Sequence, residues 1–147
     1  MDQRSLDRQL YEASERENLE TAIALLDQGA NPNAKGFSWY GCALQAASQR
    51  TSVQLVQLLL DRGADVNTAG GYCGSALLGA AQYGNTEIVI LLMNAGANLN
   101  ERGQYGTALA VARDKQFEDV VKILEKAGAA EWRPDPRDND SSFFLLS

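Results

Sequence analysis

The side chains that usually carry out acid–base, nucleophilic and metal-binding chemistry are scarce in this sequence. Its 147 residues contain no histidine, two cysteines and five tyrosines. Histidine is the commonest general base and metal ligand, so a Ser-His-Asp triad, a Cys-His pair and a histidine-containing zinc site are excluded. Two cysteines also cannot form a four-cysteine zinc site. We expect no catalytic residue, no metal and no cofactor, although chemistry by tyrosine, carboxylate, arginine or cysteine side chains is left open.

The two cysteines, Cys42 and Cys73, are far apart in the chain. Such a pair fits a reduced intracellular protein better than a secreted disulfide framework. Packed helices lie about 8–10 Å apart, whereas a disulfide needs Cα atoms within about 7 Å. We therefore expect two reduced, packed thiols.

Length and charge narrow the class of protein further. The chain suits one domain with its own core, and its composition of 45% hydrophobic and 22% charged residues excludes wholesale disorder. Thirteen Lys and Arg residues against nineteen Asp and Glu leave a formal charge of −6. This balance argues against nucleic acid and acidic membranes as partners. No stretch approaches the roughly 18 apolar residues of a membrane span, so we expect a soluble protein of the cytoplasm or nucleus.

One period organises most of the chain. The pattern Leu-Leu-Asp-Arg-Gly-Ala-Asp-Val-Asn at 59–67 has close copies at 25–33 and 92–100 and a degenerate one at 124–129. A second pattern, Gly-x-Ala-Leu, starts at Gly41, Gly74 and Gly106. Both patterns recur every 32 to 34 residues. Two patterns in phase predict stacked structural repeats.

Each repeat reads as two helices. The first begins at Cys42, Ser75 or Thr107, where the serine and threonine suit an N-cap, and it is rich in small residues. The second carries apolar residues three and four positions apart, which is one apolar helical face. Glycine then ends each second helix, where a left-handed residue is expected. These glycines are Gly29, Gly63, Gly96 and Gly128.

The period and the phrase Gly-Ala-Asp-Val-Asn resemble ankyrin repeats over about residues 5 to 130. The resemblance implies an all-α ankyrin-repeat solenoid of four helix-turn-helix units with short hairpin loops, capped by polar faces at both ends. We place the repeats at approximately 5–35, 36–69, 70–101 and 102–130. The usual Thr-Pro-Leu-His is replaced, for example by Cys-Ala-Leu-Gln at 42–45. The Tyr-Gly-x-Ala-Leu form is similar to repeats of filamentous-fungal ankyrin arrays.

Residues 131–147 form a separate C-terminal tail. Its prolines and charges cannot continue a helix, and its end, Phe-Phe-Leu-Leu at 143–146, is apolar. We predict that Trp132 packs against the final second helix. We also predict that Phe143 and Phe144 rest on an apolar surface, which is the flank of the last repeat, the groove or a neighbouring molecule.

The candidate partner-binding residues fall into two groups. Aromatic residues mark the hairpin tips, and such side chains are enriched in interface anchors. They are Phe37, Trp39, Tyr40, Tyr72 and Tyr105. The ends of the first helices supply the second group, which is Gln49, Arg50, Gln82, Tyr83, Arg113 and Asp114. Tyr40 and Tyr105 could instead stack along the array, and the helix ends could be a solvated face with local ion pairs.

The resemblance implies a monomeric, non-catalytic interaction module that binds a protein or peptide through its hairpin tips and concave face. The alternative is a small enzyme or small-molecule-binding protein whose groove is closed by the tail. Tyr83, Arg113 and Asp114 would then be the first candidates for chemistry. A deep closed pocket under the tail would favour the alternative, and an open aromatic groove would favour the binding module.

Overall fold

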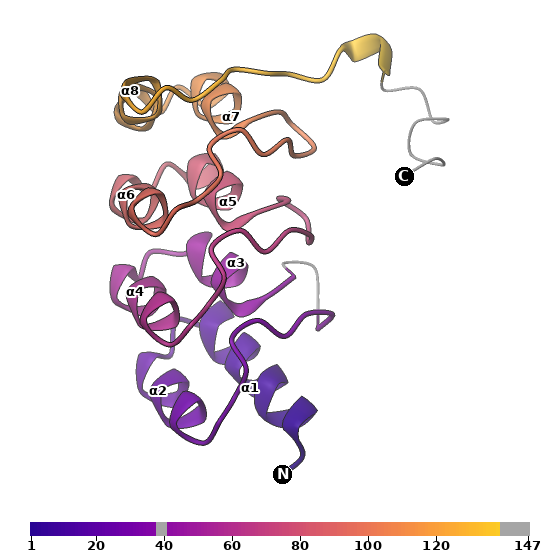
Figure 1. Cartoon of the computed structure of the whole chain (residues 1–147), viewed down its shortest axis with the longest axis vertical. Helices are drawn as coiled ribbons and strands as arrows, with labels where there is room; N and C mark the ends of the chain where they lie inside the picture. Colours follow the sequence, from indigo (N-terminus) through magenta and orange to yellow (C-terminus); the bar gives the residue numbers. More distant parts are fainter. Residues whose placement is uncertain (38–40, 139–147) are drawn as a thin grey trace.

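The computed structural model describes residues 1–37 and 41–138. Within these ranges the chain forms antiparallel helix pairs stacked in one direction (Figure 1). The helices are α1 (Gln3–Glu15), α2 (Leu19–Asp27), α3 (Ala43–Ser48), α4 (Val53–Asp61), α5 (Ala76–Tyr83), α6 (Thr86–Asn94), α7 (Ala108–Asp114) and α8 (Glu118–Lys126), followed by the short 3-10 helix η1 (Pro136–Asp138). The described residues include no strand, only isolated bridges between Gly70 and Gly74 and between Gly103 and Gly106. The predicted all-α solenoid is confirmed.

The helices form two layers. The first helices α1, α3, α5 and α7 make one column, and the second helices α2, α4, α6 and α8 make the other. Figure 1 shows the connecting loops projecting beyond the first helices, away from the second helices. We call the side formed by the first helices and these loops the concave face. The boundary between a repeat domain and a tail at residue 130 stays a prediction.

Small side chains allow the first helices to pack between two neighbours. Ala46, Ala80 and Ala112 are fully buried, so α3, α5 and α7 approach one another and the second helices closely. Each second helix contributes one leucine at the same position to the interior. Leu59, Leu92 and Leu124 are completely buried there. The periodic apolar face is therefore the core of the stack.

Glycines end the second helices as predicted. Gly63 and Gly96 both have φ +93, in the left-handed region, directly after the C-cap residues of α4 and α6. Gly29 and Gly128 have φ +96 and +81. These positive angles turn the chain from each second helix into the next loop.

Ser75 and Thr107 are the N-cap residues of α5 and α7, but only the Ser75 hydroxyl makes a capping hydrogen bond. The Ser75 hydroxyl accepts a hydrogen bond from the Leu78 amide at 3.2 Å. Thr107 is the N-cap residue of α7, as predicted, but its hydroxyl makes no capping bond. It donates instead to the carbonyl of Ala130 at 2.8 Å and accepts from the Trp132 amide at 3.1 Å. Thr107 is thus used to attach the segment after α8.

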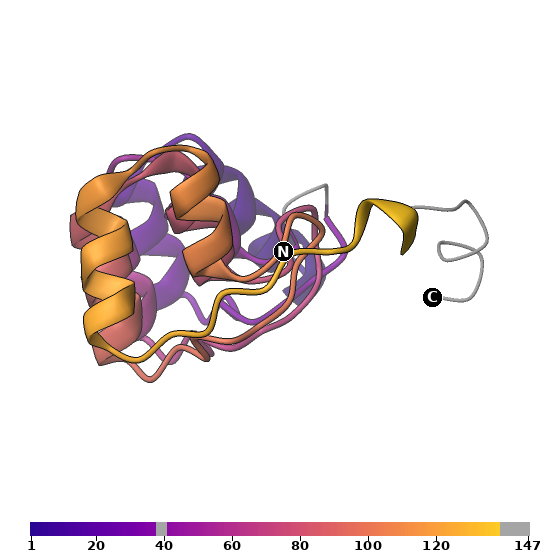
Figure 2. The same ribbon diagram turned by 90° about the horizontal axis from the view of Figure 1, so that it is seen from above.

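Trp132 takes part in the same attachment. The Thr107 amide donates to the Trp132 carbonyl at 2.9 Å, and the Arg102 guanidinium lies 4.5 Å from the centre of the indole ring. Trp132 therefore anchors the start of the tail on Thr107, the N-cap of α7, and on the loop before it, while its packing against α8 stays a prediction. Its carbonyl comes so close to Gly106 that a Cβ there would lie 2.3 Å away. Residues 131–138 leave the stack on the loop side (Figure 2).

Candidate partner-binding surface

Asparagine side chains fix each loop to the next repeat. Asn33 Oδ1 accepts from the Asp65 amide at 2.7 Å, and its Nδ2 donates to the Gly63 carbonyl at 3.0 Å. Asn67 repeats this pair, with the Asn98 amide at 2.7 Å and the Gly96 carbonyl at 3.1 Å. The loops are therefore held by side-chain bonds as well as by packing. A surface built on them is fixed before a partner arrives, which lowers the cost of binding.

We call these bonds of Asn33 and Asn67 the asparagine ladder. Both ends of the described stack take part in it. Asn100 Oδ1 accepts from the Ala130 amide at 2.8 Å. At the other end Asp7 Oδ1 accepts from the Asn31 amide at 2.7 Å, and Gln3 Nε2 donates to the Gly29 carbonyl at 3.0 Å. Gln3 thus supplies the donor and Asp7 the acceptor, whereas one asparagine supplies both between later repeats.

The first aromatic tip residue is covered by its neighbours. Phe37 packs on the buried ring of Tyr11, with ring centres 5.9 Å apart. The guanidinium carbons of Arg4 and Arg8 lie 4.3 Å and 5.9 Å from its centre. A partner would therefore meet Phe37 together with two arginines. The predicted tip residues Trp39 and Tyr40 lie outside the described residues.

Tyr72, Gln82 and Tyr105 come together on neighbouring repeats. Gln82 Nε2 donates to the Tyr72 hydroxyl at 3.5 Å, and Gln82 Oε1 accepts from the Cys73 thiol at 3.2 Å. A hydrogen bond with Tyr72 raises the pKa of Tyr105. Tyr105 remains 49% exposed. The two tyrosines are thus joined by a hydrogen bond between neighbouring repeats, and Tyr105 stays open to a partner.

The cysteines are free, buried thiols, as the sequence predicted. Burial raises the pKa of Cys73 to about 11 and also raises the pKa of Cys42. Both thiols stay protonated near neutral pH, so neither has the thiolate character of a reactive cysteine.

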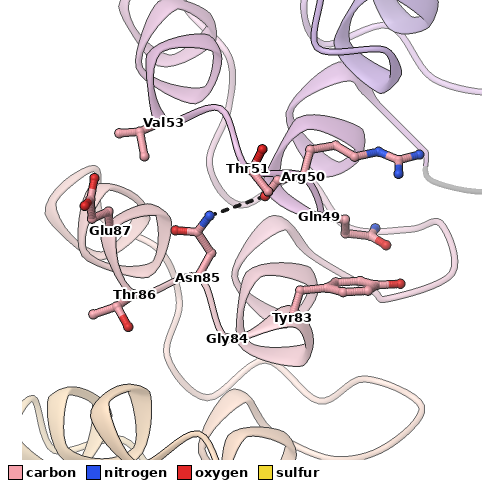
Figure 3. Close-up of a pocket in the computed structure, with 9 residues that line it drawn as sticks. All are labelled: Gln49, Arg50, Thr51, Val53, Tyr83, Gly84, Asn85, Thr86 and Glu87. Atoms are coloured by element: carbon pink, nitrogen blue, oxygen red, sulfur yellow. Dashed lines mark hydrogen bonds between the residues drawn. The ribbon is translucent and has the colours of Figure 1, made fainter.

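The ends of α3 and α5 line an open pocket of about 580 Å³ (Figure 3). Asn85 Nδ2 donates to the Arg50 carbonyl at 3.4 Å and ties the two helix turns together. In Figure 3 the side chains of Arg50 and Tyr83 extend away from the second helices α4 and α6. Tyr83 is 53% exposed, the highest exposure of any described tyrosine. A ring and a cation therefore line the same pocket on this part of the concave face.

Gln49 is less accessible than its position in the sequence suggests. Only 7% of it is exposed, and a Cβ at Gly79 would lie 2.8 Å from its Cγ. Its side chain therefore fills the space that the glycine of the next repeat leaves open. A partner would reach little of it.

Arg113 and Asp114 are joined to the start of the tail. Arg113 forms ion pairs with Glu125 and, at 3.2 Å, with Glu131. Asp114 pairs with Arg133 at 2.8 Å, and Arg133 also pairs with Glu131. This network is the local ion pairing that the sequence analysis left as the alternative for these positions.

Two features of this surface were missed from the sequence. The first feature is the asparagine ladder. The repeated Asn-x-Asn pattern predicts a turn, but it does not indicate the bonds between repeats. The second feature is the cations beside the rings. Arg102, beside Trp132, holds the same loop position as Lys35, but Arg4 and Arg8, beside Phe37, lie on α1 and left no such signal. Among residues 1–37 and 41–138, no three His, Cys, Asp or Glu side chains gather as metal ligands would. No helix in the same ranges is long and apolar enough to cross a membrane.

A family model described as ankyrin repeats, three copies, matches residues 44–135, more than half of the chain. Together with the stacked helix pairs, this match places the chain in the ankyrin-repeat family. A comparison with curated proteins finds no match. Ankyrin repeats generally mediate protein–protein interaction.

Proposed function

We propose that this chain is a non-catalytic interaction module that binds a protein or peptide through its loop tips and concave face. The observation that carries the proposal is the exposure of Tyr83 at the end of α5 and of Tyr105 on a loop, in a stack whose loops the asparagine ladder fixes. Large rings held on a rigid frame contribute contact area at low entropic cost. The module acts as a monomer, without a cofactor.

The proposal includes an intracellular location, in the cytoplasm or nucleus. Two buried thiols that make no disulfide support it, since reducing compartments keep such cysteines unpaired. The enzymatic alternative has weaker support. Arg113 and Asp114, two of its three candidate groups, are engaged in ion pairs with the tail and α8. The pocket beside Tyr83, the third, is open.

Affinity capture with matched variants tests this function. Immobilised wild-type protein, Tyr83→Ala, Tyr105→Ala and Ile90→Ala would be exposed to extract of the source cell, and the bound proteins quantified. Ile90 is 40% exposed but lies on the second helix α6, so its variant controls for loss of surface apolar area. We expect specific partners to be retained by wild type and Ile90→Ala and depleted at least about tenfold by a tyrosine variant. Equal retention by all four proteins would contradict the proposed surface.

A further inference from the structure

Four exposed cations lie on α1 and on two of the loops: Arg4 and Arg8 on the helix, Lys35 in the first loop and Arg102 in the last. We call Arg4, Arg8, Lys35 and Arg102 the cationic edge. Arg4 donates to the carbonyls of Lys35 and Gly36, at 3.2 and 3.3 Å. Lys35 Nζ in turn donates to the carbonyl of Ala69 at 3.2 Å, the equivalent position one repeat later. Arg4 is thus fixed to the first loop, and Lys35 joins the first loop to the second.

Aromatic rings back three of these cations. Arg4 and Arg8 share the ring of Phe37, and Arg102 lies on the ring of Trp132. A ring beneath a guanidinium holds its plane and leaves its N–H edge open to a carboxylate. The rings therefore orient the arginines without neutralising them.

No carboxylate in the described ranges neutralises the edge. The ion pairs found there are made by other arginines, namely Arg62, Arg113, Arg133 and Arg137. Two carboxylates lie next to edge cations in the sequence. Asp7, beside Arg8, accepts from Gln3 and from the Asn31 amide, and Glu101, beside Arg102, accepts from Asn98 Nδ2 at 3.5 Å. Two guanidiniums beside one ring repel each other, so a carboxylate from outside the chain would be favoured there. The edge keeps these positive charges although the protein as a whole has a formal charge of −6.

We propose that the cationic edge binds an acidic, extended segment of the partner protein. The inference rests on the proposed function and names the chemistry of its ligand. Adjacent repeats lie about 10 Å apart and an extended chain advances about 3.3 Å per residue, so one repeat matches about three residues. A segment of roughly nine to twelve residues can reach from Arg4, Arg8 and Lys35 at the first loop to Arg102 at the last. Ala69 holds the equivalent position of the loop between them, so the segment needs carboxylates at its two ends. Four cations in an acidic protein are too few for strong binding to phosphates, which favours a protein ligand.

Two synthetic peptides test the edge directly. Fluorescein-labelled (Glu-Gly-Gly)4 and its neutral counterpart (Gln-Gly-Gly)4 would be titrated with the full chain at 50 and 300 mM NaCl, and binding followed by fluorescence anisotropy. We expect the glutamate peptide to bind at least about tenfold more tightly at low salt and to weaken at high salt, since exposed charges are screened.

The decisive comparison uses two double variants of equal charge. Arg8→Gln with Arg102→Gln removes two edge charges whose described contacts are with aromatic rings, so no hydrogen bond of the loops is lost. Lys122→Gln with Lys126→Gln makes the same charge change on α8. We expect the first pair to weaken the glutamate peptide at least about tenfold and the second less than about twofold, with unchanged melting temperatures for both.

Each other outcome overturns the inference in a distinct way. An equal loss with both double variants would show that overall charge, not the edge, attracts the peptide. Stronger binding of a labelled 12-nucleotide single strand than of the glutamate peptide would assign the edge to nucleic acid. Absence of peptide binding, while captured partners still depend on Tyr83 or Tyr105, would remove this inference and leave the proposed function standing.

Discussion

Asp7 accepts a hydrogen bond from the Asn31 amide at 2.7 Å, the same length as the bond that Asn33 makes with the Asp65 amide one repeat later. The carboxylate of α1 thus occupies the acceptor position that asparagine occupies between the following repeats. The accompanying donor comes from a different residue, because a carboxylate has none, and Gln3 provides it. The first helix therefore continues the ladder with its own side chains.

This arrangement predicts a difference between two substitutions at Asp7. Asp7→Ala leaves the Asn31 amide without its acceptor, and we expect a loss of about 1–2 kcal/mol in the free energy of unfolding. Asp7→Asn keeps an oxygen in place and should lose less than half of that. Urea unfolding of the two variants and of Asn94→Ala, an exposed position outside the ladder, measures the difference. Equal losses for Ala and Asn would mean that the carboxylate acts by charge rather than as an acceptor.

The second prediction concerns Gly63. A Cβ there would meet no atom within 4 Å, so only the backbone angle of +93 opposes a side chain. We expect Gly63→Val to lower the free energy of unfolding by roughly 1–2 kcal/mol or more. Gly63→Asn should cost less, because asparagine tolerates the left-handed region better. Thermal or urea unfolding ranks the two, and a Val variant as stable as wild type would contradict the argument.

A third prediction follows from Glu17, whose Oε1 bridges the turns of the first two repeats. It accepts from the Thr51 amide, from the Thr51 hydroxyl at 2.9 Å and from the Ser52 amide at 2.8 Å. The hydrogen bond from the Thr51 amide is the main cause that lowers the pKa of Glu17 below its usual range. The folded state therefore favours the carboxylate form, and this stabilisation is full above the usual glutamate range and lost as the pH falls through the lowered pKa.

Glu17→Gln should consequently flatten the pH dependence of stability on the acid side. We expect the variant to be less stable than wild type at pH 7 and to approach it as the pH falls below the lowered pKa of Glu17, because there both side chains are uncharged. Urea unfolding between pH 2.5 and 7 provides the comparison. Glu20→Gln, on the exposed first turn of α2, is the control and should leave the curve of wild type unchanged in shape. Parallel curves for Glu17→Gln and wild type would refute the assigned role.

The helix pairs and their glycine ends were predictable because burial and backbone angle leave periodic traces in a sequence. Leu59 and Leu92 recur in phase, and Gly63 and Gly96 follow them at a fixed distance. Partners of polar groups leave no such trace. The pairing of Asn67 with the Gly96 carbonyl joins atoms 29 positions apart, and periodicity says only that both lie in turns.

The candidate site was predictable only where the position of a residue in its own repeat decides its exposure. Tyr83 and Tyr105 are exposed, as expected of contact residues at the end of a first helix and at a loop tip. Gln49 was predicted as a contact residue from its own repeat, but its burial is decided by Gly79 in the next. Arg8 could not be assigned to the loops, because nothing local relates a residue of α1 to Phe37.

The last prediction concerns Thr107, which attaches the segment after α8. It is 1% exposed, and its hydroxyl both donates to the Ala130 carbonyl and accepts from the Trp132 amide. Thr107→Val preserves the shape of the side chain but leaves two polar groups of the chain without their partner, at a cost of about 1–3 kcal/mol. Thr107→Ser keeps the hydroxyl and should lose less. Urea unfolding gives the total effect, and hydrogen exchange at the Trp132 amide reports whether it arises at this contact, since that amide should exchange faster in Val and near the wild-type rate in Ser. If the Val variant unfolds like wild type and the Trp132 amide stays protected, the backbone bond from the Thr107 amide alone is enough to hold the segment.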